Sequence, residues 1–127
     1  MKIPPPVAEL VGLDIVSYGG GETVMSLDVD ERHGNPMGFV QGGIICVLAD
    51  GAMGFAFATT LADGESFTTV EMKANFLRPF ATGRLTATGR VLNRGRTLGL
   101  TEVHVRDEEN RLIAHATSTC MALRPAE

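Results

Sequence analysis

The chain has 127 residues and a mass of 13.5 kDa, which suits one compact domain over residues 1–127 and is too short for a two-domain enzyme. Apolar residues make up 44% of the sequence and the mean hydropathy is +0.11, so the composition is not that of a disordered chain. The net charge is −4 and no segment is concentrated in basic residues, which argues against nucleic acid as the main partner.

The lack of a recognisable targeting signal and the setting of the two cysteines both favour a cytoplasmic protein. Residues 1–6 lack the apolar core and cleavage site of a secretory signal, and Asp50 and several glycines interrupt the longest apolar stretch, so no membrane span is expected. Cys46 and Cys120 lie among apolar neighbours, which is typical of buried, reduced thiols. The histidines lie far apart and have no metal-ligand spacing with either cysteine, so no metal site is expected. They are His33, His104 and His115.

Two strands are predicted near the start of the chain. Residues 11–17 and 22–30 alternate apolar and polar side chains, and a glycine-rich turn at residues 18–21 separates them. This pattern is typical of a β-hairpin. A loop rich in turn residues follows at residues 31–38.

Residues 43–61 have the length and composition of a helix that is buried on nearly every side. Apolar residues occur on almost all of its faces, whereas a surface helix has a polar face. After this segment, apolar and polar side chains again alternate with a period of two, and this pattern continues to the end of the chain. The predicted strands are residues 66–77, 83–93, 97–107 and 111–123.

Together these elements predict an α+β fold, in which a curved antiparallel sheet of five to six strands wraps one long central helix. The four later strands have short connections and are expected to form an antiparallel meander, to which the first hairpin adds. The sheet must curl around the helix to cover so many of its faces. Part of each apolar surface would still be open, so we expect the chain to form oligomers.

Asp50 is the only charged residue between Gly43 and Leu61. An ionised carboxylate in apolar surroundings costs several kcal/mol unless it has partners, which favours a functional role. A carboxylate at a wet subunit boundary, or one that caps a neighbouring loop, is the alternative interpretation. Gly42 and Gly43 begin the helix and leave its first backbone N–H groups accessible, so they can stabilise a negative oxygen. A tight turn into the helix explains the same two glycines.

The spacing of these residues predicts a site that needs two chains. Gly42 and Asp50 are eight residues apart, or about 12 Å at 1.5 Å per residue, too far for both to contact one carbonyl. Two helices that run antiparallel across a dimer would bring Gly42 of one chain beside Asp50 of the other.

Residues 33–43 (HGNPMGFVQGG) and 48–54 (LADGAMG) resemble the hotdog-fold acyl-CoA thioesterases of the phenylacetate-pathway type, similar to PaaI. The H-x-N-x-x-G loop, the paired glycines and the L-A-D segment occur in that family's order and spacing. Residues 75–79 and 95–98 also resemble it, and the similarity extends over residues 11–123. The resemblance implies a hotdog fold.

The resemblance also implies catalytic roles. The backbone N–H of Gly42 would polarise the thioester carbonyl, and Asn35 would hold that carbonyl or the attacking water. Asp50 of the partner chain would act as general base or as nucleophile, and the sequence leaves both routes open. Thr68, in the strand after the helix, would position water, with Thr69 as the alternative because a shift of one residue changes the face.

One position departs from the family pattern. Many relatives have histidine where this chain has Gln41, so an amide that does not titrate replaces the residue that usually supports the thioester. Gln41 and Gly43 are expected to contact substrate. The phosphates of coenzyme A would need cations, which Arg78, Arg94 and Arg96 offer at strand ends, although such arginines are usually only solvated.

The activity implied by the resemblance is hydrolysis of acyl-CoA thioesters to a carboxylic acid and free CoA, with aryl-acetyl or medium-sized acyl groups favoured. CoA is then part of the substrate, and no separate cofactor is expected. The active site would require a homodimer, and a homotetramer made of two dimers is expected from related proteins. Two alternatives stay open: a non-catalytic acyl-CoA-binding or regulatory module, because of Gln41, and a hotdog dehydratase, which needs a histidine paired with an acid.

Overall fold

The structure, a computed structural model, describes residues 2–125 and contains a six-stranded sheet around one long helix. The predicted α+β architecture is confirmed. In chain order the elements are α1 (Pro6–Val11), β1 (Leu13–Gly19), β2 (Glu22–Val29), η1 (Glu31–His33), α2 (Gly42–Ala58), β3 (Ser66–Phe76), β4 (Gly83–Arg94), β5 (Leu98–Arg106) and β6 (Leu112–Leu123). The short helix α1 was not predicted, because six residues after a run of prolines show no helical period.

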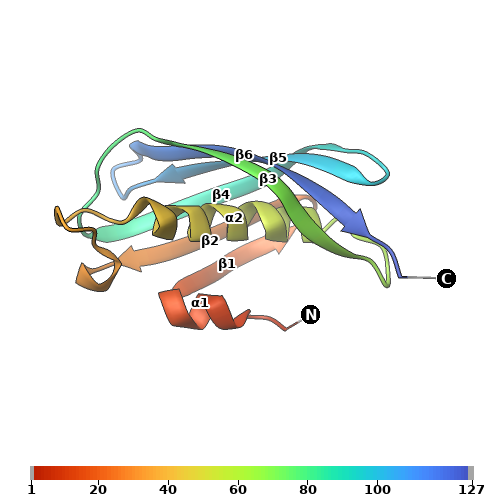
Figure 1. Ribbon diagram of the computed structural model, residues 1–127, viewed down its shortest axis with the longest axis horizontal. Coiled ribbons are helices and arrows are strands. Elements are labelled where there is room, and N and C mark those ends of the chain that lie inside the picture. Colours follow the sequence, from red (N-terminus) through yellow and green to blue (C-terminus); the bar gives the residue numbers. More distant parts are fainter. Residues whose placement is uncertain (1, 126–127) are drawn as a thin grey trace.

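The strands are antiparallel throughout, in the order β1-β2-β4-β5-β6-β3, and the sheet curves around α2 (Figure 1). The predicted meander is correct for β4, β5 and β6 but wrong for β3, which pairs with β6 instead of β4. Residues 77–82 separate β3 from β4, and the carbonyl of Phe80 accepts a hydrogen bond from the N–H of Val40 at 2.7 Å. This connection is therefore docked beside the start of α2, so it does not form a hairpin.

The helix α2 packs closely on the concave side of the sheet. A Cβ at Gly89 of β4 would lie only 2.7 Å from the carbonyl carbon and oxygen of Ala52, so only glycine permits this approach. Each large apolar side chain that is fully buried here contributes roughly 1.5–3 kcal/mol. The buried residues of α2 are Ile45, Leu48, Ala49, Ala52, Met53, Gly54, Ala56 and Phe57. Within residues 2–125 no helix combines the length and the apolar content that crossing a membrane requires.

β3 forms one edge of the sheet. Among the strands of residues 2–125 it pairs with β6 alone, so its outer backbone groups face away from the sheet. Two of its apolar side chains are also exposed, Val70 by 56% and Phe76 by 52%. An edge strand with exposed apolar side chains favours pairing with a further strand. This edge lies next to the candidate site.

Candidate active site

Asp50 and Thr69 form a polar pair between α2 and β3. Thr69 Oγ1 donates a hydrogen bond to Asp50 Oδ1 at 2.9 Å. Thr69 faces the helix because Phe67, two residues earlier, packs on Phe57 with ring centroids 5.7 Å apart. Side chains alternate along a strand, so Thr68 projects to the other face, where it is exposed. The structure thus brings Thr69, and not the predicted Thr68, to Asp50.

A shallow cavity of about 280 Å³ surrounds this pair, and we call it the Asp50 pocket. Asp50 is exposed there, and within residues 2–125 its second oxygen, Oδ2, has no hydrogen-bond or ion-pair partner. Burial and the nearby Asp50 carboxylate raise the pKa of the Cys46 thiol, so this thiol stays protonated near neutral pH and is a poor nucleophile. The carboxylate is therefore the group in this cavity that can accept a proton from water. The lining residues are Gly43, Cys46, Val47, Asp50, Thr69 and Met72.

The first turn of α2 presents two backbone donors. The N–H groups of Gly42 and Gly43 have no carbonyl partner within residues 2–125, as is usual at a helix N-terminus. A Cβ at Gly42 would lie 3.2 Å from a ring carbon of Phe76, so glycine allows the end of β3 to approach the start of the helix. The helix dipole adds partial positive charge here, which suits an oxygen that becomes negative.

Asn35 lies in the loop before α2, and this loop fixes its side chain. Its Oδ1 accepts hydrogen bonds from the N–H groups of Met37 at 2.9 Å and Phe39 at 3.1 Å. The Nδ2 group is then the donor that the side chain can offer to a ligand. Asn35 and Gly42 line one cavity of about 330 Å³, which we call the Gly42 pocket.

The two pockets are separate within one chain. Gly42 and Asp50 line different cavities, and eight residues of helix place them about 12 Å apart. The structure therefore brings Asn35 to Gly42 and Thr69 to Asp50, but it does not bring these two pairs to one point. Besides Asn35, Gly42 and Arg78, the Gly42 pocket is lined by Met37, Phe39, Val40, Ile45, Phe76, Leu77, Pro79 and Phe80.

Gln41 immediately precedes α2, and its side chain is exposed and makes no capping hydrogen bond. Its backbone N–H donates to the carbonyl of His33 at 2.8 Å. The buried ring of His33 joins two segments: Nε2 donates to the carbonyl of Val11 at 2.8 Å, and Nδ1 accepts from the N–H of Asp30 at 3.0 Å. His33 therefore has a structural role, and both of its ring nitrogens are occupied by these contacts.

The three arginines predicted to bind phosphate lie at two ends of the molecule. Arg78 lines the Gly42 pocket, whereas Arg94 is the last residue of β4 and Arg96 lies in the turn that follows it, beyond the C-terminal end of α2 (Figure 1). Arg94 is also held by the protein itself. Its Nε donates to Thr60 Oγ1 at 2.9 Å, and its guanidinium lies 4.8 Å from the ring centroid of Phe57. One chain therefore does not gather these cations into a single phosphate site.

A group of titratable side chains on the outer face of the sheet was missed by the sequence reasoning. It consists of Glu102 and His104 on β5 and His115 on β6, with His104 directly opposite His115 in the strand register. The two histidines are eleven positions apart, and only the pairing of β5 with β6 brings them together. The pairing of β5 with β6 has an irregularity between Val105 and Arg106, and the sequence pattern did not indicate it.

Comparisons with known proteins agree with the fold. The model of the family described as thioesterase superfamily matches residues 37–114. A 1,4-dihydroxy-2-naphthoyl-CoA hydrolase from Listeria monocytogenes is 31% identical over 111 residues, which cover 87% of this chain and 90% of that protein. A thioesterase structure from Haemophilus influenzae has a TM-score of 0.91 and 27% identity, and the match covers 98% of this chain and 87% of that chain.

The structural likeness extends to the phenylacetic acid degradation proteins. A variant of PaaI from Thermus thermophilus has a TM-score of 0.87 and 28% identity, and the match covers 94% of this chain and 100% of that chain. The segment that matches the family model includes Gly42, Asp50 and Thr69, and Asn35 lies just before it. The chain therefore belongs to the thioesterase superfamily, has the hotdog fold of these proteins and is a thioester hydrolase.

Proposed function

We propose that the chain hydrolyses acyl-CoA thioesters with aryl-acetyl or medium-sized acyl groups, at a site shared between two copies of the chain. The observation that carries this proposal is the carboxylate of Asp50, which Thr69 holds at an exposed point of an otherwise apolar helix. A carboxylate with one oxygen fixed and the other open is suited to act on a water molecule. The names of the relatives support a CoA thioester as substrate.

In the proposed mechanism the thioester carbonyl accepts hydrogen bonds from the N–H of Gly42 and the Nδ2 of Asn35. Asp50 takes a proton from water, and the resulting hydroxide attacks the carbonyl carbon. Negative charge then develops on the carbonyl oxygen, where the helix N-terminus stabilises it. The C–S bond breaks, the CoA sulfur takes the proton that Asp50 removed from water, and the carboxylic acid leaves. Attack by Asp50 itself, through a mixed anhydride that water then cleaves, uses the same contacts.

The edge position of β3 supports a site made from two chains. β3 supplies Thr69 to the Asp50 pocket and Phe76 to the start of α2, and its outer backbone groups are available for pairing. Two β3 strands that pair antiparallel would continue the sheet and set two α2 helices side by side in opposite directions. In that arrangement the Gly42 pocket of each chain meets the Asp50 pocket of the other. From the family resemblance we propose that two such dimers form a homotetramer.

The size and lining of the Gly42 pocket favour a compact acyl group. Its volume of about 330 Å³ is near the lower end of the range for small-molecule sites, and most of its lining is apolar. An aryl-acetyl or medium-sized acyl group suits such a pocket better than a long chain. Arg78 lines the same pocket, and we assign it to the CoA phosphates. In the antiparallel pair, the turn after β4 of the opposed chain would lie at this end of the site and would add its exposed Arg96 as a second cation.

A panel of acyl-CoA thioesters tests this function directly. We expect release of free thiol, with phenylacetyl-CoA or a medium-chain acyl-CoA cleaved faster than a long-chain one. Tight binding of acyl-CoA without thiol release would instead favour a binding module, and hydration of an enoyl-CoA would favour a dehydratase.

Subunit mixing tests the shared site. The variants Asp50→Asn and Gly42→Val should each be inactive alone. When they are unfolded and refolded together, half of the dimers are mixed, and each mixed dimer has one intact site, so about a quarter of the wild-type activity should return. A site contained within one chain predicts no recovery on mixing.

A further inference from the structure

The outer-face cluster consists of Glu102, His104 and His115. Val103 and Val105, which alternate with the first two of these residues along β5, are fully buried against the core. Glu102 and His104 therefore project from the opposite side of the sheet, away from α2 and from both pockets of the candidate active site. The cluster serves no step of the proposed hydrolysis, so its chemistry has to be considered separately.

The distances within the cluster suit a bound metal ion. His104 Nδ1 lies 3.5 Å from Glu102 Oε1, and His115 Nε2 lies 3.7 Å from Glu102 Oε2. One ligand atom from each residue lies within 4.8 Å of the others. Two ligands of a tetrahedral zinc ion at about 2.0–2.1 Å from the metal are about 3.3–3.4 Å apart. Small side-chain rotations would therefore bring all three ligand atoms onto one ion.

The chemistry of the three groups selects the kind of ion. Two imidazole nitrogens and one carboxylate oxygen match the preferences of zinc and similar transition metals, whereas magnesium and calcium prefer oxygen ligands alone. All three side chains are partly exposed, with 36%, 18% and 30% of the His104, Glu102 and His115 side chains accessible, so an ion could enter and retain a water ligand. The backbone of two paired strands holds the ligands in fixed positions.

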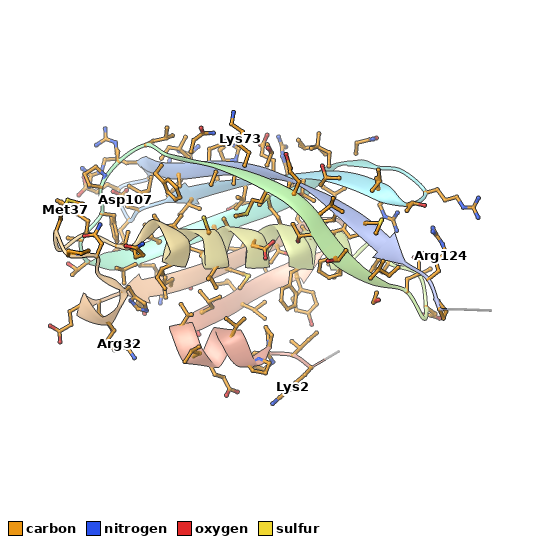
Figure 2. All side chains as sticks on the ribbon, viewed as in Figure 1. Lys2, Arg32, Met37, Lys73, Asp107 and Arg124 are labelled. Atoms are coloured by element: carbon orange, nitrogen blue, oxygen red, sulfur yellow. The ribbon has the colours of Figure 1, made fainter. Side chains whose placement is uncertain are left out.

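Neighbouring cations on the outer face oppose this binding. Arg90 on β4 lies 3.6 Å from Glu102 Oε1, and Arg106 on β5 acts electrostatically on His104. Lys73 on β3 lies opposite Thr117, which itself lies opposite Glu102, and Figure 2 shows Lys73 projecting from this face. The Arg90 side chain is 55% exposed and can turn into solvent when an ion takes its place.

We propose that Glu102, His104 and His115 bind one divalent transition-metal ion of the zinc type on the outer face of the sheet, with water completing its coordination. The ion would join β5 to β6 and would stabilise the folded chain, because the unfolded chain does not hold the three ligands together. The site is independent of thioester hydrolysis. It departs from the expectation that the histidines form no metal site.

Titration of the metal-free, untagged protein with Zn²⁺, followed by NMR of its imidazole groups, tests the proposal. The chain has only three histidines. We expect the resonances of His104 and His115 to shift and to saturate at one equivalent per chain, while those of buried His33 stay unchanged. Equal shifts of all three histidines, or no saturable shift, would overturn the site.

Variants supply the matched control. His115→Gln should weaken Zn²⁺ affinity by at least about tenfold, since changes outside the ligand set itself already cost 10–100-fold. Thr117→Val alters a residue of the same strand face that offers no strong metal ligand, and it should leave the affinity unchanged. Co²⁺ in place of Zn²⁺ gives a visible absorption band that reports the ligand set independently of folding. If His115→Gln binds either ion as well as the wild type, the proposal is wrong.

Discussion

Replacing Asp50 by asparagine should separate chemistry from folding. The amide keeps the shape of the side chain and still accepts the hydrogen bond from Thr69, but it does not take a proton from water. We expect Asp50→Asn to lower turnover by at least about a hundredfold with little change in melting temperature. Thiol release and thermal unfolding measure the two quantities. Turnover close to that of the wild type would remove Asp50 from the mechanism.

The two neighbouring threonines of β3 offer a second comparison. Thr69 holds the Asp50 carboxylate, whereas Thr68 is exposed on the other face. Because a hydrogen bond to a charged group contributes about 1.5–3 kcal/mol, Thr69→Val should lower kcat by about tenfold or more. Thr68→Val is the matched control and should keep most of the activity. The reverse order of effects would show that the water is positioned from the other face of β3.

The sequence contained clear signals for some of these residues and none for others. A lone carboxylate in an apolar helix and a glycine pair at its start are local features, so Asp50 and Gly42 could be recognised without a structure. The choice between Thr68 and Thr69 depended on the packing of Phe67 against α2, which is a tertiary contact. A pattern of period two defines two faces but does not say which face is inside.

The turn between β5 and β6 depends on Asp107. This carboxylate accepts hydrogen bonds from the backbone N–H groups of Glu109 at 3.0 Å and Arg111 at 2.8 Å, and from Arg111 Nε at 2.7 Å (Figure 2 labels Asp107). Desolvation acts to raise the pKa of Asp107, but the hydrogen bonds and charge of Arg111 outweigh it, and the pKa falls below its usual 3.8.

A lowered pKa makes the stabilisation by Asp107 dependent on pH. The folded state favours the ionised carboxylate, so this contribution is present above pH 3.8 and is lost as the pH falls through the lowered pKa. Asp107→Asn should therefore have a lower melting temperature than the wild type near pH 7, and the difference should shrink towards about pH 3. Thermal unfolding at several pH values measures it. A difference that does not change with pH would contradict the role of the charge.

The pairing of β3 shows where prediction from sequence stopped. Strand existence followed from the alternation of side chains, and all six strands were found. Strand order did not follow, because the expected meander assumed that each connection joins neighbouring strands, whereas residues 77–82 dock beside α2 through Phe80 and Val40. Long-range pairing is set by such contacts and leaves no local signature.

The assembled molecule can be tested at the exposed edge of the sheet. Val70 lies on β3 and is 56% exposed, and a lysine there would oppose pairing with a second β3 strand. We expect Val70→Lys to lower both the fraction of dimer, measured by light scattering, and the thioesterase activity. Val16→Lys is the control, because Val16 is 59% exposed on β1 at the opposite edge. A dimeric and active Val70→Lys variant would exclude β3 as the interface.

The length of helix between Gly42 and Asp50 has a kinetic consequence. If neither protomer carries a complete set of reacting groups, the catalyst exists only while two protomers are associated, and the rate per milligram of enzyme depends on how concentrated the enzyme is. Serial dilution should then lower the specific rate once the concentration falls below the dissociation constant of the pair, and the loss should reverse on reconcentration. A cell that doubles its supply of this chain in that regime would gain more than twice the hydrolytic capacity.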